Sequence, residues 1–451
     1  MVKRVEDVLK VVESVPLVDT HEHLQPEPDR LSVSQDPLRL FLHYVADDLS
    51  SAGITLDEWE KVVDPSRPWE ERVAIFEEYW EYAKTTGYAQ ALRIALRDLY
   101  GVEDINRRTF PKLVEALNAC ATSGFYRRVL QRANIAKIIA DHGDFPELTV
   151  EPKLDKDYFV LVRRYELFTF PRTWEDLYTI SRVVKTPVRN LSDLERALRM
   201  WVRETLPRYV GVKIGFPAYE LSLKFEYATY SEAEYALKAL IEGGSRVPQP
   251  SIDELKPLHS YLLRVLLQEA EAVGKPVQVH TGIQSWSAAE PKGARWYPYP
   301  GAWKHAPPVN AINNANPTLL VNLFKEFAGV KFVLFHAGYP YSREAGVLAK
   351  QYPNVFLDLC WMHEVNPKAY EEILDEWLEL VPSNKVMAFG GDYSHIEGTY
   401  GASRLARRGV AKVLRRKIED GRWDVEDAVK VAWRILRTNA QKLFNLTLPP
   451  A

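Results

Sequence analysis

A short apolar run near the start of the chain ends in two histidines that are separated by one residue. The run spans residues 16–20, and His21 and His23 follow it. Successive side chains of a β-strand point to opposite faces, so both imidazoles would emerge on one face at the carboxyl end of this strand. Two imidazoles placed in this way can bind one metal ion.

Seven further apolar runs follow after residue 134, and amphipathic segments separate most of them. The runs lie at 135–140, 158–162, 209–214, 276–280, 331–336, 354–359 and 385–389. Helical spacing of apolar residues marks 191–206, 252–273, 317–327, 343–351 and 367–381, and 424–443 would be a closing helix. Eight short strands joined by helices predict an α/β fold, the parallel (β/α)₈ TIM barrel.

A stretch of about a hundred residues after the first strand has a different pattern. Apolar residues recur at helical spacing in 69–80, 88–99 and 111–117, and no alternating strand pattern interrupts them. We therefore predict a barrel made of residues 1–24 and 134–451, with a helical insertion over 25–133.

Composition limits the classes of partner. The 451 residues include 58 Lys and Arg against 61 Asp and Glu, a net charge of −3, which argues against nucleic acid or an anionic membrane as a partner. The two cysteines, Cys120 and Cys360, are too few for a disulfide framework and fit a reducing compartment. The N-terminal stretch lacks the continuous apolar region of a signal peptide. We expect a cytoplasmic protein that acts on a small molecule and forms a homo-oligomer.

The predicted barrel indicates where its reactive groups should lie, because in such barrels they are found at the carboxyl ends of the strands. Polar residues at those ends are His21, His23, Lys213, His280, His336 and Asp392. A single histidine there could simply bond a backbone carbonyl, but four in one barrel favour a metal site. We predict His21, His23, His280 and Asp392 as the ligands, because imidazole and carboxylate are usual ligands of zinc and similar ions.

Two further residues would surround this site. His336 is the expected proton-transfer residue, since its ordinary pKa lies near neutrality, although it could be a further ligand. Lys213 lies within an apolar run, where its amine requires a partner. It would bind a substrate carboxylate or phosphate, or be carbamylated and bridge two metals, or form an ion pair with Asp19 or Glu22.

Candidate substrate-binding residues lie in the loops after the strands. Arg343, after strand six, could bind a carboxylate in bidentate fashion, although arginines on helix surfaces are common. His395 would orient substrate at the mouth. Trp303 belongs to an aromatic-rich connection within 281–316, which would form a lid over the mouth or a subunit contact.

Four motifs together resemble the amidohydrolase superfamily, in particular its amidohydrolase-2 branch of hydrolases and decarboxylases. They are Val18-Asp-Thr-His-Glu-His23, Val279-His-Thr-Gly282, Phe335-His-Ala-Gly-Tyr-Pro340 and Gly391-Asp392. The stretches Ala315-Asn-Pro317 and His336 to Ala345 are similar to the amidohydrolase-like domain found alone or fused to glutamine-synthetase-like proteins.

The resemblance implies one divalent ion on His21, His23, His280 and Asp392. Zinc is expected, manganese or iron would also suit the ligands, and a second ion requires a carbamylated Lys213. A metal-activated water would attack the carbonyl-like carbon of a C–N group in a small, carboxylated substrate, while Asp392 or His336 accepts its proton.

Three alternatives remain at this point. Uronate isomerases, of the same superfamily, have a similar length and a long helical insertion, but this sequence has His336 after strand six and Tyr-Ser-His after Asp392 instead of Ser-Arg. Metal-dependent decarboxylation is the second alternative. A barrel without catalytic function is the least favoured, because every ligand position is filled.

Overall fold

Eight parallel strands form the sheet of this protein in a computed structural model, which describes residues 8–33, 35–41, 43–141, 153–244, 250–285 and 310–448. Each strand pairs with the next one along the chain, in the order β1 to β8. The strands are β1 Leu17–Glu22, β2 Ile135–Ala140, β3 Phe159–Arg163, β4 Gly211–Ile214, β5 Val277–Val279, β6 Phe332–Leu334, β7 Val355–Asp358 and β8 Val386–Met387. The predicted eight-stranded barrel is confirmed.

Backbone hydrogen bonds close the barrel between its first and last strands. The amide of Thr20 donates to the carbonyl of Phe389 at 3.2 Å, and the amide of Asp392 donates to the carbonyl of His21 at 2.8 Å. The amide of His23 then donates to the carbonyl of Tyr393 at 2.9 Å. The segment after β8 thus runs alongside the end of β1 and brings Asp392 next to His21.

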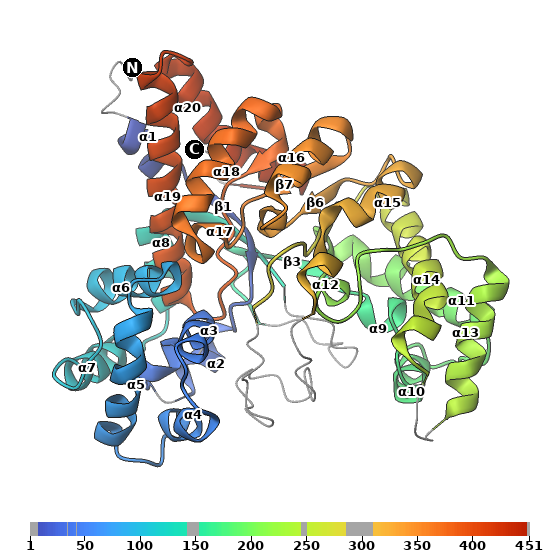
Figure 1. Ribbon diagram of the computed structural model, residues 1–451, viewed down its shortest axis with the longest axis horizontal. Helices are drawn as coiled ribbons and strands as arrows, with labels where there is room; N and C mark the ends of the chain where they lie inside the picture. Colours follow the sequence, from blue (N-terminus) through green and yellow to red (C-terminus); the bar gives the residue numbers. More distant parts are fainter. Residues whose placement is uncertain are drawn as a thin grey trace.

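Helices connect the strands and cover the outside of the barrel (Figure 1). After α1 (Val8–Ser14), the helices between β1 and β2 are α2 Glu27–Leu31, α3 Tyr44–Ser51, α4 Leu56–Val63, α5 Trp69–Ala83, α6 Gly87–Tyr100, α7 Phe110–Cys120 and α8 Phe125–Ala133. Those from β3 to β5 are α9 Glu166–Thr169, α10 Trp174–Val183, α11 Leu191–Thr205, α12 Phe216–Glu220, α13 Tyr230–Gly243 and α14 Ile252–Ala272. The remainder are α15 Val321–Glu326, α16 Ser342–Gln351, α17 Met362–Val365, α18 Pro367–Leu380, α19 Ile396–Glu419, α20 Val425–Trp433 and α21 Asn439–Leu443.

Local sequence signals explain where several helices begin. A reciprocal capping box, in which a Ser or Thr side chain and an acidic residue three positions later satisfy each other's backbone amides, opens four of them. The pairs are Thr55 with Glu58, Thr173 with Asp176, Thr229 with Glu232 and Ser251 with Glu254. These signals fix the first turns of α4, α10, α13 and α14.

The longest helix, α19, has no counterpart in the sequence prediction, and neither have α10 and α13. The buried face of α19 is built largely of small residues, including Gly398, Gly401, Ala402 and Ala406, so this helix lacks a pattern of large apolar residues. The closing helix predicted over 424–443 is divided, because a π-helical turn at Arg434–Thr438 separates α20 from α21.

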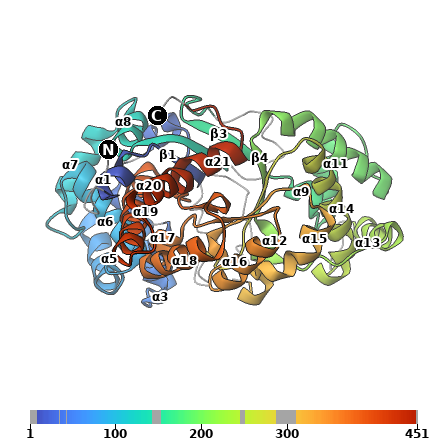
Figure 2. The same ribbon diagram turned by 90° about the horizontal axis from the view of Figure 1, so that it is seen from above.

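The described regular elements between β1 and β2 are all helices, and several of them pack against the end of the chain. A Cβ atom on Gly401 of α19 would lie 1.9 Å from the carbonyl oxygen of Ala91 in α6, so this helix contact requires glycine. Figure 2 shows α5 to α8 beside α19 at one end of the molecule and α11, α13 and α14 at the other. The proposed boundary between a barrel and a separate helical insertion stays a prediction.

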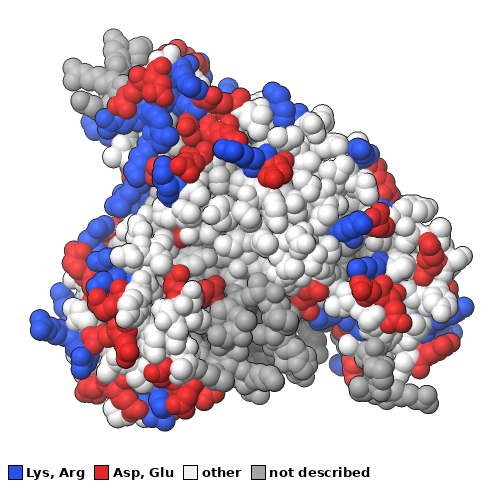
Figure 3. All heavy atoms as spheres, in the orientation of Figure 1, with Lys and Arg blue, Asp and Glu red and all other residues white. Residues whose placement is uncertain are grey.

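On the face shown in Figure 3, acidic and basic side chains mix around the periphery, and the middle of the face carries few of either. Among the described residues, no helix combines the length and the apolar character needed to cross a lipid bilayer.

One buried arginine joins the start of β1 to the end of α8. Arg407 of α19 is fully buried and donates hydrogen bonds to the carbonyls of Val12, Val15, Ala133 and Asn134. The amide of Leu17 also donates to the carbonyl of Asn134 at 2.8 Å. The guanidinium therefore accepts no bond itself but donates to carbonyl groups of both segments that lead into the first strand pair, one before β1 and one before β2.

We expect Arg407→Met to lower the free energy of unfolding by about 3 kcal/mol, because it leaves these buried carbonyls without their charged donor. Urea unfolding followed by tryptophan fluorescence measures the change. Arg415→Met on the same helix is the control: its side chain is 63% exposed and paired with Glu419, so we expect a change within about 0.5 kcal/mol. Equal unfolding curves for the two variants would contradict this role for Arg407.

Candidate metal centre

Three histidines, two at the end of β1 and one after β6, meet at the carboxylate of Asp392. Its Oδ1 atom lies 3.3 Å from Nε2 of His21 and 3.2 Å from Nε2 of His23. Its Oδ2 atom lies 3.9 Å from Nε2 of His336. His21 and His336 are fully buried, and Asp392 is only 5% exposed. The structure therefore brings four of the predicted site residues together.

His280 joins this group through His336, because its Nδ1 atom lies 2.9 Å from Nε2 of His336. The opposite nitrogens of both rings face backbone carbonyls: Nε2 of His280 faces Ile283 at 2.8 Å, and Nδ1 of His336 faces Cys360 at 3.2 Å. A carbonyl only accepts hydrogen bonds, so each of these outer nitrogens carries the ring proton. Two nitrogen lone pairs consequently face each other in the buried mouth of the barrel.

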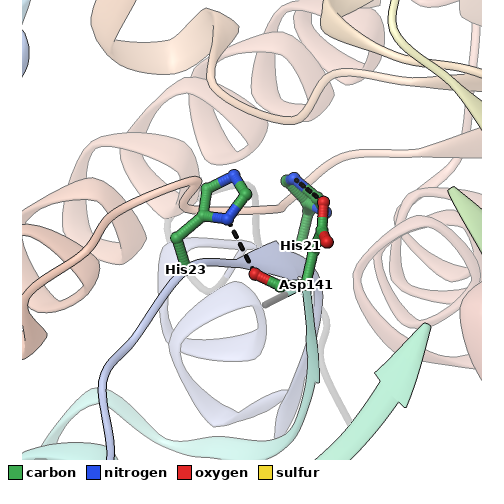
Figure 4. A group of neighbouring side chains, drawn as sticks. All are labelled: His21, His23 and Asp141. Carbon is green, nitrogen blue, oxygen red and sulfur yellow. Dashed lines mark hydrogen bonds and ion pairs between the residues drawn. The ribbon is translucent and has the colours of Figure 1, made fainter. Parts of the chain in front are cut away.

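His23 shows the same arrangement (Figure 4). Its Nδ1 atom donates to the backbone carbonyl of Asp141 at 2.8 Å, so Nε2 presents a lone pair to Oδ1 of Asp392. The carboxylate of Asp141 lies 3.9 Å from Nε2 of His21. Figure 4 shows that Asp141, at the end of β2, contacts both His21 and His23, which come from the end of β1.

A positive charge is needed between these facing acceptors, and a bound divalent cation fits better than a proton. Burial, with the charge of Lys213 next, lowers the pKa of both His21 and His280 well below the ordinary value. Burial and the neighbouring His280 do the same for the pKa of His336. Neutral imidazoles are the form that binds metal.

The spacing of the acceptors agrees with this interpretation. Although burial opposes ionisation, the pKa of Asp392 is lowered, with the charge of Lys213 among the causes, so its carboxylate is ionised. Ligand atoms about 2.0–2.2 Å from one ion lie about 3.3 Å apart in tetrahedral geometry. The 3.2 Å and 3.3 Å separations around Oδ1 of Asp392 match that value.

Backbone conformation directs the side chains that follow β6, β7 and β8. His336, Trp361 and Asp392 have φ angles of 58°, 69° and 61°, the left-handed region that residues other than glycine rarely adopt. Strained backbone of this kind is concentrated at functional sites. The Trp361 ring packs edge-on against the His336 ring, with centroids 5.2 Å apart. Each strand end thus turns a side chain toward the same mouth.

A glycine permits the approach of the loops that carry His280 and His336. Gly282 has a φ angle of 73°, and a Cβ atom on it would lie 2.4 Å from the carbonyl carbon of Gly338. The amide of Ile283 donates to the carbonyl of Tyr339 at 2.6 Å across this contact. The Val279-His-Thr-Gly282 motif therefore joins the ends of β5 and β6.

Lys213 is buried beside the cluster, on β4. Its Nζ atom lies 4.0 Å from the centroid of the Phe335 ring and has no hydrogen-bond partner in the part of the chain that the structure describes. Burial, reinforced by the charge of Arg164, lowers its pKa to about 8. One of the three predicted roles of Lys213 was an ion pair with Asp19 or Glu22. The described contacts of Lys213 include no such ion pair.

The other predicted substrate-binding residues have different surroundings. The Arg343 side chain is 84% exposed and forms an ion pair with Glu376 at 3.1 Å, as expected for an arginine on the outer surface of a helix. His395 is buried and caps α19, where its Nδ1 atom accepts from the amide of Gly398 at 3.1 Å. Trp303 lies outside the described residues.

The sequence analysis missed Asp141 and Arg164, which lie at the ends of β2 and β3. Arg164 donates to both carboxylate oxygens of Asp141, at distances of 2.7–3.1 Å, and pairs with Glu166 at 3.2 Å. Although burial opposes it, the charge of Arg164 holds the pKa of Asp141 well below its usual range. Asp141 carries the signal used for the histidines, a polar residue directly after an apolar run, and Arg164 lies two residues after the run at 158–162.

Comparisons with known proteins agree with this geometry. A family model of the amidohydrolases matches residues 194–446, which is more than half of the chain. The curated protein fluG from Emericella nidulans is 27% identical over 396 residues, which cover 75% of this chain and 42% of fluG. The chain therefore spans less than half the length of that relative.

Solved structures share the fold over nearly the whole chain. A uronate isomerase from Thermotoga maritima has a TM-score of 0.77 at 15% identity, covering 98% of this chain and 97% of the isomerase. A Lactobacillus casei protein assigned to the metal-dependent hydrolases has a TM-score of 0.67 at 19% identity, covering 97% of both chains. With its eight-stranded barrel, its group of histidines and Asp392, and the family match, the chain belongs to the amidohydrolase family.

Proposed function

We propose that this protein is a metal-dependent hydrolase that cleaves a C–N bond, in an amide or a related group, of a small carboxylated substrate. The facing acceptor atoms of His21, His23 and Asp392, with the His280 and His336 pair beside them, carry this proposal. Buried groups of this kind require a cation, and a cation at the mouth of a barrel can act on a substrate there.

A divalent ion bound here, expected to be Zn²⁺, would polarise the scissile carbonyl and acidify a water molecule. Ionised Asp392 would accept the proton of the attacking water. His336 lies 3.9 Å from Asp392, beyond direct hydrogen-bond distance, and would relay that proton to the leaving nitrogen through one bridging water. Lys213 would bind the substrate carboxylate, with His395 and Trp303 as further predicted contacts.

One prediction of this proposal concerns the metal content of the protein. Protein purified without chelator should contain about one divalent ion per chain, measured by plasma mass spectrometry, and chelation should abolish turnover. We expect His23→Ala to lower the metal content roughly tenfold or more, because it removes one lone pair from the cluster.

His259→Gln provides a matched control for that variant. His259 is a buried histidine that contacts only the backbone carbonyl of Pro171 among its described hydrogen bonds, at 2.9 Å. Glutamine can still donate to that carbonyl, so the metal content should equal that of the wild type. Wild-type protein that lacks metal, and gains no activity from added zinc or manganese, would refute the proposal.

Another prediction of this proposal concerns the dependence of kcat/KM on pH. Because the pKa of Lys213 is lowered to about 8, its amine is charged below that pH and neutral above it. For a carboxylated substrate, kcat/KM should fall about tenfold per pH unit above about 8, while kcat at saturating substrate changes less. Lys213→Met should show a low kcat/KM that does not fall in this way as the pH rises. If kcat/KM of Lys213→Met showed the same fall, Lys213 would not be the group that binds the carboxylate.

Uronate isomerisation is the second candidate, favoured by the TM-score of 0.77 to a uronate isomerase over 98% of this chain. In either reaction the substrate carboxylate would need a cationic partner. Arg164 already forms ion pairs with the carboxylates of Asp141 and Glu166, so Lys213 is our candidate for this partner.

A substrate comparison separates the two reactions. With glucuronate or galacturonate we expect no ketose, whereas a panel of N-acyl amino acids and monoamides of dicarboxylic acids should include a compound that releases amine or ammonia. Ketose formation that depends on the metal, without amine release from any member of the panel, would favour the isomerase.

A further inference from the structure

We propose that Tyr44 is a positioning residue that holds Asp392 in the orientation needed to bind the metal ion. Tyr44 lies on α3, in the helical segment between β1 and β2, and its hydroxyl donates to the backbone carbonyl of Asp392 at 2.6 Å. The inference rests on the proposed function, in which Asp392 is a metal ligand. It assigns to the helical segment a direct part in the geometry of the site.

The backbone of Asp392 is held from two sides. Its amide donates to the carbonyl of His21 on β1 at 2.8 Å, and its carbonyl accepts from Tyr44 on α3. Between these two bonds the residue has a φ angle of 61°, a conformation that residues with a Cβ atom disfavour. Without the second bond, the peptide between Asp392 and Tyr393 keeps, among its described hydrogen bonds, only the one that the Tyr393 amide donates to Glu22 at 2.6 Å, so the orientation of the Asp392 carboxylate toward His21 and His23 is less firmly held.

Regular structure near Asp392 cannot perform this task. The strand β8 ends at Met387, and α19 begins at Ile396, so neither element contains Asp392. Its orientation therefore depends on individual hydrogen bonds to neighbouring segments. Partners that hold a ligand in this way typically change metal affinity 10- to 100-fold when they are removed.

The ring of Tyr44 is itself fixed by aromatic packing. It stacks on Tyr88 of α6 with centroids 5.1 Å apart, and it contacts the rings of Trp361 and Tyr393 at 4.8 Å and 5.3 Å. The side chain of Tyr44 is 5% exposed. A buried ring with contacts on several sides presents its hydroxyl at one place, which suits a group that must position another.

The helix that carries Tyr44 is also fixed at two points. The hydroxyl of Thr86 donates to Asp48 at 2.5 Å and joins α3 to α6. The hydroxyl of Ser285, in the loop after β5, donates to Asp47 at 2.8 Å. The helix α3 therefore reaches from the loop of Asp392 to the loop that follows His280, across the mouth of the barrel.

Tyr44→Phe tests the inference, because it removes the hydroxyl and keeps the ring. Zinc affinity of the full-length apoprotein is measured by competition with a chromophoric chelator, and the cobalt-substituted protein is examined by visible absorption. We expect zinc affinity to fall between 10- and 100-fold, with a changed cobalt spectrum. In steady-state assays kcat should fall while KM stays near the wild-type value.

Tyr88→Phe is the matched control, since it removes a hydroxyl from the neighbouring ring of the same stack. We expect its zinc affinity to stay within twofold of the wild type. Circular dichroism establishes that both variants are folded, and Asp392→Asn calibrates the loss caused by weakening the ligand itself.

Three results would overturn the inference. Equal zinc affinity and equal cobalt spectra for Tyr44→Phe and the wild type would show that the hydroxyl does not position Asp392. Equal losses in Tyr44→Phe and Tyr88→Phe would assign the effect to packing of the aromatic stack. A wild-type protein that binds no zinc, cobalt or manganese would overturn the proposed function together with this inference, whereas the first two results leave the proposed function intact.

Discussion

The contact on which the site depends is the one between Asp392 and the histidines that surround it. Oδ1 of Asp392 faces the Nε2 atoms of His21 and His23, and the lone pairs of His280 and His336 face each other nearby. Acceptors arranged in this way repel one another in a buried site unless a positive charge lies between them. The fold holds these groups together from the ends of β1, β5 and β6 and from the segment after β8, and a cation bound among them would relieve their repulsion.

Sequence periodicity predicts the barrel well because short apolar runs and helical spacing are local properties. It also predicts the His21 and His23 pair, because alternate residues of a strand share a face. It fails for α19, whose buried face includes Gly401 and the charged Arg407 instead of a stripe of large apolar residues. Small residues and a buried arginine are defined by the neighbours they touch, and those neighbours are distant in the sequence.

The same limit applies within the site. Asp141 could have been found from its place after a strand, but the role of Tyr44 depends on a contact with Asp392, 348 positions away along the chain. Arg343 shows the opposite case, since its place after β6 suggested the mouth, yet its helix turns it outward to Glu376. Position after a strand identifies candidates, and only the direction of the side chain decides among them.

Arg407 has a consequence for how a chain of this kind can change. By bonding carbonyls at Val12, Val15, Ala133 and Asn134, one guanidinium joins the segments that lead into β1 and β2, at the end of the barrel opposite to its mouth. The pairing of β1 with β2 is then secured independently of what lies between them. A barrel built in this way can exchange or remodel a long segment at its mouth without refolding its sheet, so new substrate preferences can arise beside an unaltered set of histidines.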